Sequence, residues 1–327
     1  MIVAVDAAGG DFYPKNPVQG AIEATNENTG LTVLLVGPED IIKKELENYS
    51  YDEDRVLVHD APQVIGMEES PAQAVKTKQQ SSIVVGVGLH KAGKCDAFVS
   101  AGNTGALLAA SMFILGKLEG VLRPTIAAYY PTLKGFRLLV DAGANLEIKP
   151  ETASQFSKMA EIYCEQILNI NSPKVALLNV GEEEGKGTDL LKEIYTHLKD
   201  QDNFIGNVEG KDIMYGKADV FLCDGLVGNI VLKFGESIPE ILEKIIGKAI
   251  RDLDLSKEEA LTIQKVLKTA LSPFNYENVG GIPFLGVNGV SVVGHGGSSP
   301  LAIKNMIKSA VQTVENDVNG KIVASLN

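Results

Sequence analysis

The residue types best suited to chemistry lie in the stretch 93–110, with the sequence GKCDAFVSAGNTGALLAA. Its apolar run Ala97–Ser100 is typical of a buried strand, and the glycine turn that follows leads into an alanine- and leucine-rich helix. Unpaired N–H groups at a helix start favour an anion such as phosphate. Ser100, Asn103 and Thr104 add side-chain donors to such a site. The stretch alone leaves an ordinary strand-to-helix turn as the alternative.

Polar, glycine-rich loops also follow the other strands that the sequence predicts. Ligands of mostly parallel sheets bind beyond the carboxyl ends of the strands, so we expect these loops to converge on one cleft. An ordinary turn is the alternative for any one of them. The loops are Asp6–Asp11, Ser100–Thr104, Asp141–Asn145, Asn179–Glu183, Asp224–Asn229 and Gly294–Ser299.

Short runs rich in valine, isoleucine and leucine alternate with helical segments along the chain. This alternation predicts an α/β fold in which helices cover both faces of a mostly parallel sheet. The predicted strands are Ile2–Val5, Thr32–Val36, Val56–Val58, Ala97–Ser100, Leu138–Val140, Val175–Asn179, Val220–Cys223 and Val290–Val293. The predicted helices are Pro14–Thr25, Glu39–Asn48, Glu151–Leu168, Asp189–His197 and Pro300–Val318.

The chain echoes itself in two places. Residues 93–105 and 216–228 share Gly, Lys, Asp, Phe and both loop glycines in register. The echo predicts two similar strand-to-helix loops, and chance similarity between apolar strands is the alternative. The flanking residues do not match, so a tandem duplication is not indicated.

The strand pattern stops over residues 236–274, where two helices are predicted. Apolar residues of the first follow the helical period, and Ser256 with Glu259 forms a capping box at the start of the second. We expect this hairpin to project from a single α/β catalytic domain that spans 1–327. The apolar face of the hairpin must be buried against another surface. A packed core or a subunit interface is one alternative, and a membrane surface that attracts its lysines is the other.

The composition excludes several classes of protein. With 30 basic and 42 acidic residues the net charge is −12, which argues against a protein wrapped broadly around nucleic acid. The 3 cysteines are widely spaced, fit neither a disulfide framework nor a zinc cluster, and indicate a reducing cytoplasm. The first residues are typical of a strand rather than a secretory signal, and no apolar run of about 18 residues could span a membrane.

Two nucleotide-binding motifs fail on their spacing. Asn179–Thr188 resembles a phosphate-binding loop, but only three residues separate Gly181 from Gly185 where the motif has four. Gly86–Gly88 lacks the third glycine and the acidic residue of a dinucleotide site. Lys186 could still reach a phosphate or an oxyanion, with a solvated surface lysine as the alternative. The four histidines show no metal-ligand spacing, so no metal is indicated.

Taken together, the ordered loops resemble the PlsX family, the bacterial phosphate acyltransferases of phospholipid synthesis. Ala8, Leu226, Ile282 and Phe284 depart from the family pattern, but these are apolar changes that bear on packing or acyl-chain preference more than on the reaction. The matching motifs run through the whole chain: DAAGGD from Asp6, SAGNTGA from Ser100, DAGAN from Asp141, NVGEE from Asn179, GNVEG from Gly206, DGLVGN from Asp224, GGIPFLG from Gly280 and GHGGS from Gly294.

The resemblance implies an enzyme that transfers a long-chain fatty acyl group from acyl carrier protein to inorganic phosphate. The acyl phosphate would serve phosphatidic acid synthesis, and no cofactor is implied. The family also implies an αβα sandwich with a Rossmann-like sheet, similar to the phosphotransacetylase and isocitrate dehydrogenase-like folds. It further implies a cytoplasmic homodimer with peripheral membrane contact through the helical hairpin, and a membrane glycerol-phosphate acyltransferase as a partner.

Such a reaction needs phosphate held against the thioester carbonyl and donors for the oxyanion that forms. We assign Ser100, Asn103 and Thr104 to phosphate, Lys186 and Asn229 to the thioester oxygen or the phosphate, Asp6, Asp11 and Asn145 to orientation, and His295 to proton transfer. A hydrogen-bonded structural histidine is the alternative for His295. Cys223 would be the residue to suspect if a covalent acyl-enzyme formed.

Two rival functions stay open. One is a short-chain phosphotransacetylase that uses coenzyme A, and the other is a non-catalytic, membrane-associated scaffold that binds acyl carrier protein. The carrier is acidic, so its docking needs a local basic patch. The basic residues of the hairpin form one candidate patch, and Lys76, Lys78, Lys91 and Lys94 form the other.

Overall fold

The computed structural model describes residues 1–274, 277 and 279–326, and within them the strands form one 11-stranded sheet. The strand order is β3-β2-β1-β4-β11-β10-β5-β6-β9-β7-β8. The strands are β1 (Ile2–Asp6), β2 (Thr32–Gly37), β3 (Val56–Asp60), β4 (Ala97–Ser100), β5 (Thr125–Thr132), β6 (Gly135–Val140), β7 (Val175–Leu178), β8 (Phe204–Val208), β9 (Val220–Leu222), β10 (Ile282–Leu285) and β11 (Ser291–Val293). The sequence predicts all of these except β5, β8 and β10.

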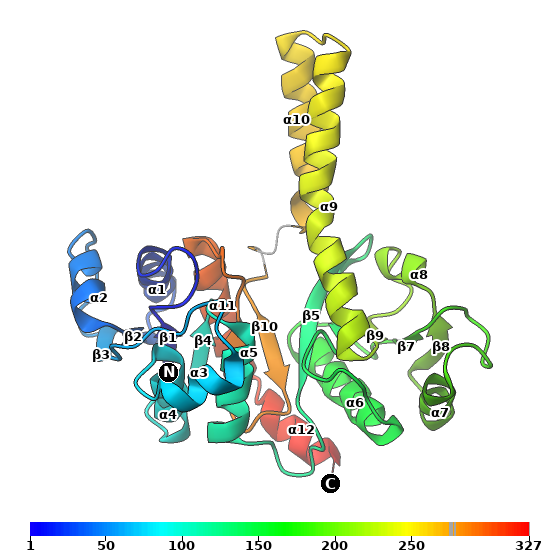
Figure 1. Ribbon diagram of the computed structural model, residues 1–327, viewed down its shortest axis with the longest axis horizontal. Helices are drawn as coiled ribbons and strands as arrows, with labels where there is room; N and C mark the ends of the chain where they lie inside the picture. The colour runs from blue at the N-terminus through cyan, green and yellow to red at the C-terminus, as the bar shows by residue number, and fades with distance from the viewer. Residues whose placement is uncertain (275–276, 278, 327) are drawn as a thin grey trace.

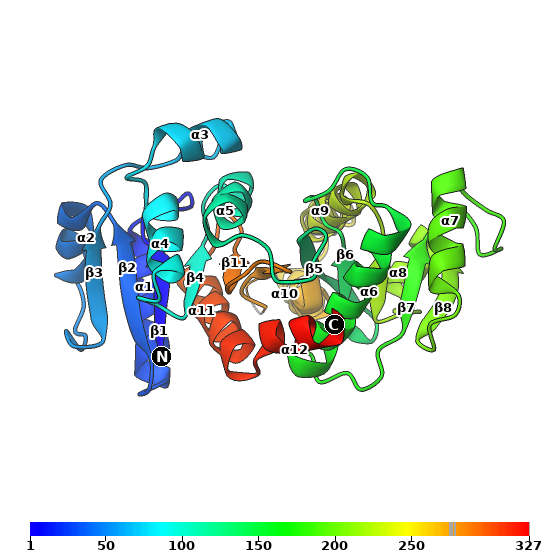
Figure 2. The ribbon, with the colours of Figure 1, turned by 90° about the horizontal axis from the view of Figure 1, so that it is seen from below.

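Two groups of parallel strands occupy the two halves of the sheet (Figure 2). The first group contains β1, β2, β3, β4 and β11, and the second contains β6, β9, β7 and β8. Between them, β10 and β5 pair antiparallel with both of their neighbours. The prediction of an α/β fold with a mostly parallel sheet is confirmed, and the structure adds a central antiparallel pair.

Helices cover both faces of the sheet because side chains alternate along each strand (Figures 1 and 2). Val3 and Val5 join a core cluster with α1, α2 and α11, whereas Ala4 faces α3, α4 and α5. In the second group Leu138 packs with α6, α7 and α12, and Leu139 packs with α8 and α9. The helices are α1 (Lys15–Glu27), α2 (Glu39–Leu46), α3 (Pro71–Thr77), α4 (Ser82–Lys91), α5 (Thr104–Ala110), a π-helix (Ser111–Leu115), α6 (Pro150–Gln166), α7 (Asp189–Leu198), α8 (Gly210–Met214), α9 (Gly225–Asp252), α10 (Lys257–Leu271), a 3-10 turn (Ser272–Phe274), α11 (Pro300–Glu315) and α12 (Val318–Leu326).

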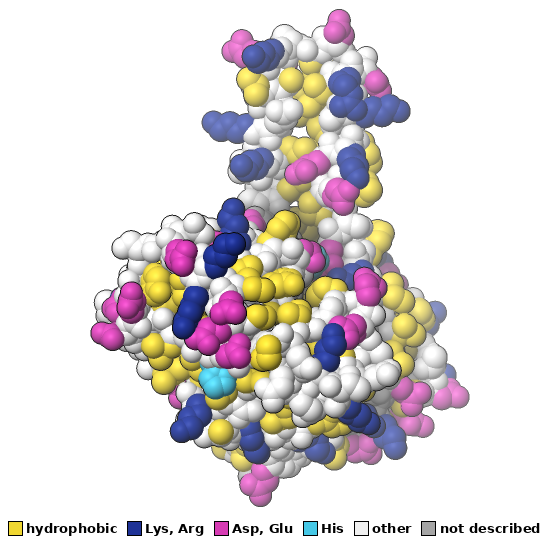
Figure 3. Space-filling model, turned by 60° about the vertical axis from the view of Figure 1, so that its left-hand side comes forward, with side chains coloured by type: hydrophobic (Ala, Val, Ile, Leu, Met, Phe, Trp, Pro, Cys, Tyr) yellow, Lys and Arg dark blue, Asp and Glu magenta, His cyan; other side chains and the backbone are white. Residues whose placement is uncertain are grey.

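Helices α9 and α10 form a hairpin that stands away from the body of the molecule (Figure 1). The capping box is present, since Ser256 Oγ accepts the Glu259 N–H at 3.3 Å and Glu259 Oε2 accepts the Ser256 N–H at 2.9 Å. The first helix begins at Gly225 and not near residue 236 as predicted, because the Asp224 carboxylate caps it. None of the described residues of α10 is buried, and hydrophobic and basic side chains both line the hairpin (Figure 3).

The two echoed stretches enter their strands in the same way. Gly93 and Gly216 both have a positive φ, at 68° and 62°, where each chain turns toward its strand. Asp96 Oδ2 then accepts the Ile2 N–H at the start of β1 at 2.7 Å, and Asp219 Oδ2 accepts the backbone N–H just before β7 at 2.8 Å. Each aspartate therefore ties its strand to the beginning of a neighbouring one. The loops that follow the strands differ, however, because Asn103 caps α5 whereas Asp224, two positions earlier in the aligned register, caps α9.

Candidate functional site

The first strand-end region lies at the carboxyl ends of β1, β4 and β11 and consists of residues 6–11, 100–104 and 294–299. Its buried centre is Asp6, which accepts the Ser100 hydroxyl at 2.6 Å and the Ala8 N–H at 3.1 Å. Ser100 Oγ in turn accepts the Gly102 N–H at 3.0 Å. Burial raises the pKa of Asp6, and hydrogen bonds, led by the one from Ser100, oppose that rise. Two residues predicted from separate loops are thus in direct contact.

Glycines let the loops of this region approach one another closely. A Cβ on Gly9 would lie 2.4 Å from Asp6 Oδ2. Gly10 has a φ of +88°, and a Cβ there would lie 2.8 Å from Gly296 O. The Asp11 N–H donates to that same carbonyl oxygen at 2.8 Å. The predicted loop residues therefore meet across glycine backbone, where a larger side chain would not fit.

His295 belongs to the same region through the backbone of its loop. The Gly294 N–H donates to Ser100 O at 2.8 Å, which joins this loop to β4. The Ser298 hydroxyl donates to His295 O at 2.6 Å, and the Gly297 N–H donates to His295 Nδ1 at 3.2 Å. A neutral ring that accepts at Nδ1 carries its proton on Nε2. The assigned role of His295 in proton transfer stays a prediction.

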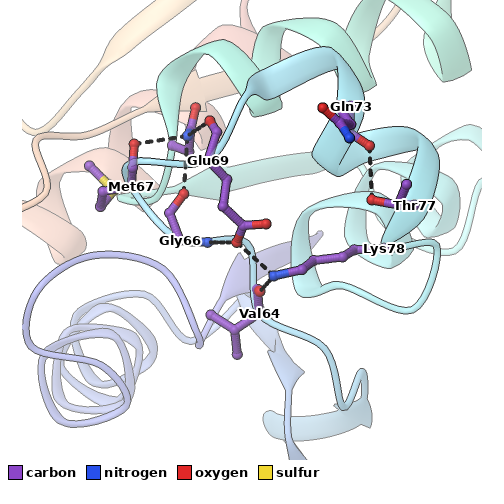
Figure 4. A network of polar contacts seen from close by, with 8 residues as sticks. Val64, Gly66, Met67, Glu69, Gln73, Thr77 and Lys78 are labelled. Carbon is purple, nitrogen blue, oxygen red and sulfur yellow. Dashed lines mark hydrogen bonds and ion pairs between the residues drawn. The ribbon is translucent and has the colours of Figure 1, made fainter.

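Asn103 uses both polar groups of its side chain within the protein. Oδ1 accepts the Ala106 N–H at 3.0 Å and caps α5. Nδ2 donates to the carbonyl oxygens of Gly66, Met67 and Glu69 at 3.1, 3.1 and 3.2 Å, within the network that Figure 4 shows. The structure therefore gives Asn103 a positioning role, and its contact with phosphate stays a prediction.

The second strand-end region follows β6 and β9 and consists of residues 141–145 and 224–229. At its centre the buried Asp141 carboxylate accepts five hydrogen bonds. Oδ1 accepts the N–H groups of Ile126, Gly143 and Ala144 at 3.2, 3.2 and 3.1 Å. Oδ2 accepts the Asn145 N–H at 2.6 Å and its side-chain amide at 2.8 Å. Asn145 is thus held within the loop and helps to fix its shape.

Helix α9 starts in contact with this region. A Cβ on Gly228 would lie 1.8 Å from Asp141 O, so only glycine fits where the helix crosses the loop. Asn229 is exposed, and a Cβ on Gly143 would lie 3.7 Å from Asn229 Cβ. The Asn229 amide therefore stands at the open side of the second strand-end region.

The two regions adjoin through three residues of β10. Ser100 is linked across β11 to Ile282. Two residues further along β10, Phe284 pairs with Ile126, whose carbonyl oxygen accepts the Ala142 N–H at 3.0 Å. Two residues of a strand span roughly 7 Å. The loop after β6 and helix α5 also contribute to one core cluster. Three antiparallel pairings separate β11 from β6, so the two strand groups run in opposite directions. The short β10 and the shared core cluster are what bring their carboxyl ends near one another at the centre of the sheet.

Lys186 lies in the loop after β7, on the far side of β9 from β6. Its Nζ is exposed and 3.8 Å from Glu183 Oε1, and its carbonyl oxygen accepts the Asn179 amide at 3.1 Å. Within the part of the chain that the structure describes, no hydrogen bond or ion pair joins Lys186 to Asn229. The convergence of this loop with the others, and the role of Lys186, stay predictions.

Cys223 is unsuited to nucleophilic attack. It is buried, and its Sγ lies 3.5 Å from the carbonyl oxygen of Asp141 as a hydrogen-bond donor. Burial, with the charges of Asp141 and Asp224 beside it, raises the pKa of the thiol well above its usual value. The reactive thiolate is therefore suppressed.

Two supports of the site lie outside the residues predicted for it. One is Asp141, which organises the second strand-end region although only its neighbour Asn145 was assigned. The signal was available, because an aspartate followed by small residues ends β1 in the same way. The other is the segment 66–69, which Asn103 holds. No local pattern connects that segment with residues more than 30 positions away.

Comparison with known proteins agrees with this architecture. A family model described as fatty acid synthesis protein matches residues 1–321. A phosphate acyltransferase of Chlorobaculum parvum is 48% identical over 338 residues, which cover 100% of this chain and 99% of that protein. A phosphate acyltransferase of Dictyoglomus turgidum is 44% identical over 330 residues, which cover 100% of this chain and 98% of that one.

Solved structures share the fold at low sequence identity. A phosphotransacetylase from Streptococcus pyogenes gives a TM-score of 0.61 at 16% identity, with 95% of this chain and 94% of that chain covered. A branched-chain phosphotransacylase from Enterococcus faecalis gives 0.55 at 14% identity, with 95% and 99% covered. These likenesses confirm the predicted fold. The identity with its relatives extends over the whole chain, and the chain therefore belongs to the fatty acid synthesis protein family and is an enzyme, a phosphate acyltransferase.

Proposed function

We propose that this enzyme transfers a long-chain fatty acyl group from acyl carrier protein to inorganic phosphate. A phosphate oxygen attacks the thioester carbonyl carbon, and the carbon–sulfur bond breaks. The carrier leaves as a thiol with the proton that phosphate gives up, and the products are acyl phosphate and free carrier. This reaction balances without a cofactor. The names of the relatives support acyl transfer to phosphate, and the family description supports a role in lipid synthesis.

The observation that carries this proposal is the junction of the two strand-end regions at β10. Two reacting groups need adjacent seats, because holding them together removes much of the entropic cost of their encounter. We assign phosphate to the first region, where the backbone of Gly9 and Gly102 lies beside Ser100 and the Asp6 carboxylate, and where Thr104 begins α5. Asn229 of the second region then serves the thioester oxygen. His295 is assigned to proton transfer, with its Nε2–H given to the leaving carrier sulfur and replaced by the proton that phosphate loses.

The decisive experiment mixes the enzyme, palmitoyl-acyl carrier protein and phosphate, and traps acyl phosphate with hydroxylamine. We expect hydroxamate only when enzyme and phosphate are both present. Loss of the carrier thioester without hydroxamate would contradict the proposal, and so would carrier binding with no loss of thioester. The second outcome is the one expected of a non-catalytic scaffold.

A short-chain phosphotransacetylase is the second candidate, because the fold is that of phosphotransacetylases. It performs the same chemistry with coenzyme A as the thiol carrier. Acetyl-coenzyme A and palmitoyl-acyl carrier protein are therefore compared as donors at equal phosphate. We expect kcat/KM to favour the long-chain carrier substrate, and a preference for acetyl-coenzyme A would support the second candidate.

In the predicted basic cluster for carrier docking, two of the four lysines are engaged within the protein. Lys78 Nζ donates to Val64 O at 2.7 Å and to Glu69 Oε1 at 2.6 Å, and Lys91 Nζ donates to Leu115 O at 3.3 Å. Lys76 and Lys94 are the exposed members of that cluster that remain for an acidic partner. Charge reversal at both positions should raise KM for the acylated carrier and leave KM for phosphate unchanged.

The helical hairpin supports a further part of the proposal, that the chain acts as one catalytic domain with a projection over 236–274. Ile241, Ile245, Leu261 and Val266 of this projection are 49%, 59%, 56% and 63% exposed. We propose that a homodimer partner and a membrane surface cover these side chains, and that a membrane glycerol-phosphate acyltransferase receives the product. No helix among the described residues is long and apolar enough to cross a bilayer.

Oligomer and membrane contact are tested on the Ile245→Glu variant. The expected results are a lower mass in sedimentation and weaker flotation with phosphatidylglycerol vesicles. Unchanged mass and unchanged flotation would contradict this part of the proposal and leave the proposed reaction standing.

A further inference from the structure

Met67 is exposed, yet its backbone is held firmly. The Asn103 amide donates to the carbonyl oxygens of Gly66, Met67 and Glu69. Glu69 Oε1 closes the same turn by accepting the Gly66 N–H and Lys78 Nζ, each at 2.6 Å. Figure 4 shows the Met67 side chain pointing away from this network. The fold therefore presents an apolar side chain on a fixed turn.

The Met67 thioether lies beside the first strand-end region. A Cβ on Gly296 would lie 3.0 Å from Met67 Cε and 3.5 Å from each carboxylate oxygen of Asp11. Phe12 follows Asp11 in the chain and is 57% exposed, and Met67 is 44% exposed. Met67 thus stands beside the region assigned to phosphate, and the exposed Phe12 continues the loop whose Asp11 contacts the same glycine.

We propose that Met67 and Phe12 form the first part of the acyl-chain subsite. This inference rests on the proposed function and names the residues that sense the donor chain. The hydrocarbon must leave the carbonyl carbon beside the phosphate seat, and covering exposed apolar surface favours its binding. Methionine adapts to a flexible chain because its side chain is unbranched and polarizable. The Glu69 carboxylate forms an ion pair with Lys78, so it does not face the hydrocarbon of the acyl group as an unpaired charge.

The test compares palmitoyl- and octanoyl-acyl carrier protein as donors for the full-length enzyme. Met67→Ala and Phe12→Ala should each lower the ratio of their kcat/KM values, palmitoyl over octanoyl, by roughly threefold to tenfold. Met67→Leu should preserve the ratio, since it retains apolar volume. Ile205→Ala is the matched control, because Ile205 is 41% exposed on β8 at the opposite edge of the sheet.

Three outcomes would overturn the inference. The ratio could stay at the wild-type value in both alanine variants, or both donors could lose activity equally. The third is weaker binding of Met67→Ala to phosphatidylglycerol vesicles at an unchanged ratio, which would assign the patch to a lipid surface. Failure of the wild-type enzyme to form acyl phosphate from either donor is distinguishable from all three, because it overturns the proposed function itself.

Discussion

Each strand-end region is built around a buried aspartate, but the two carboxylates are satisfied differently. Asp141 accepts four backbone N–H groups and one side-chain amide. Asp6 accepts hydrogen bonds from the Ser100 and Ser82 hydroxyls and from the Ala8 and Gly9 N–H groups, and burial raises its pKa. A carboxylate that accepts mostly from backbone N–H groups fixes the shape of a loop, whereas one that accepts from rotatable hydroxyls can respond to a bound anion. We infer that the second region is the more rigid support and that the first is the more chemically responsive.

The largest expected effect comes from removing the Asp141 carboxylate. Asp141→Ala should lower the free energy of unfolding by about 4 kcal/mol, because several buried N–H groups lose their acceptor together. Asp6→Ala should cost about half as much, because two of its donors are hydroxyls that can turn to other acceptors, whereas four of those to Asp141 are fixed backbone N–H groups. Urea unfolding followed by circular dichroism measures both values. If Asp6→Ala lowered the free energy of unfolding as much as Asp141→Ala or more, the second region would not be the more rigid support.

A second comparison uses the echoed positions Ser100 and Cys223. Each stands where the chain leaves its strand, but Ser100 donates to a carboxylate and Cys223 to a backbone carbonyl. Ser100→Ala should lower kcat/KM about a hundredfold if its hydroxyl helps to seat phosphate. Cys223→Ala should leave kcat within about twofold, because no covalent acyl-enzyme is required.

The same pair has a chemical control. Iodoacetamide should not label native Cys223, because the thiol is buried and its pKa is raised. Rapid alkylation of Cys223, together with loss of activity in Cys223→Ala, would support the alternative mechanism in which Cys223 is the nucleophile of a covalent acyl-enzyme. Equal activity of the two alanine variants would remove Ser100 from the proposed phosphate seat.

Local sequence predicted most of the sheet because eight strands contain continuous apolar runs. The strands that it missed lack that signal. Pro131 lies in β5 and Pro283 in β10, and Gly206 of β8 has a φ of +95°. Such residues have low strand propensity, so neighbouring strands must stabilise these segments. The start of α9 was missed for a similar reason, since Gly225 and Gly228 disfavour a helix that tertiary contacts nonetheless hold.

The candidate site was predictable in composition but not in geometry. Glycine-rich loops after strands identified Asp6 and Ser100, yet their contact joins residues 94 positions apart. Asn103 was recognised as a polar residue at a helix start, while the three carbonyl oxygens that engage its amide lie in a segment without any motif. Residue types indicate which chemistry is available, and long-range packing decides which groups are free to perform it.

A third prediction extends the comparison within the second half of the sheet. Lys186→Ala should raise KM for the acylated carrier about tenfold if the lysine turns toward the second strand-end region, to which the thioester oxygen is assigned, when the donor binds. Lys192→Ala is the matched control, since Lys192 is 44% exposed and pairs with Asp189, whereas Lys186 is 50% exposed and pairs with Glu183. Equal KM values for the two variants would leave Lys186 as a solvated surface charge.

The smallest expected effect is a pH dependence that belongs to Asp6. Because burial raises its pKa in the folded protein, the folded state binds the proton more tightly than the unfolded chain does. The stability from this group is fully present below the unfolded value of 3.8 and is lost as pH rises through the folded value. Asp6→Asn cannot titrate, so the wild-type advantage over it should shrink from pH 4 toward neutral pH. Urea unfolding of both proteins across that range measures the difference, and parallel stability curves would contradict the raised pKa of Asp6.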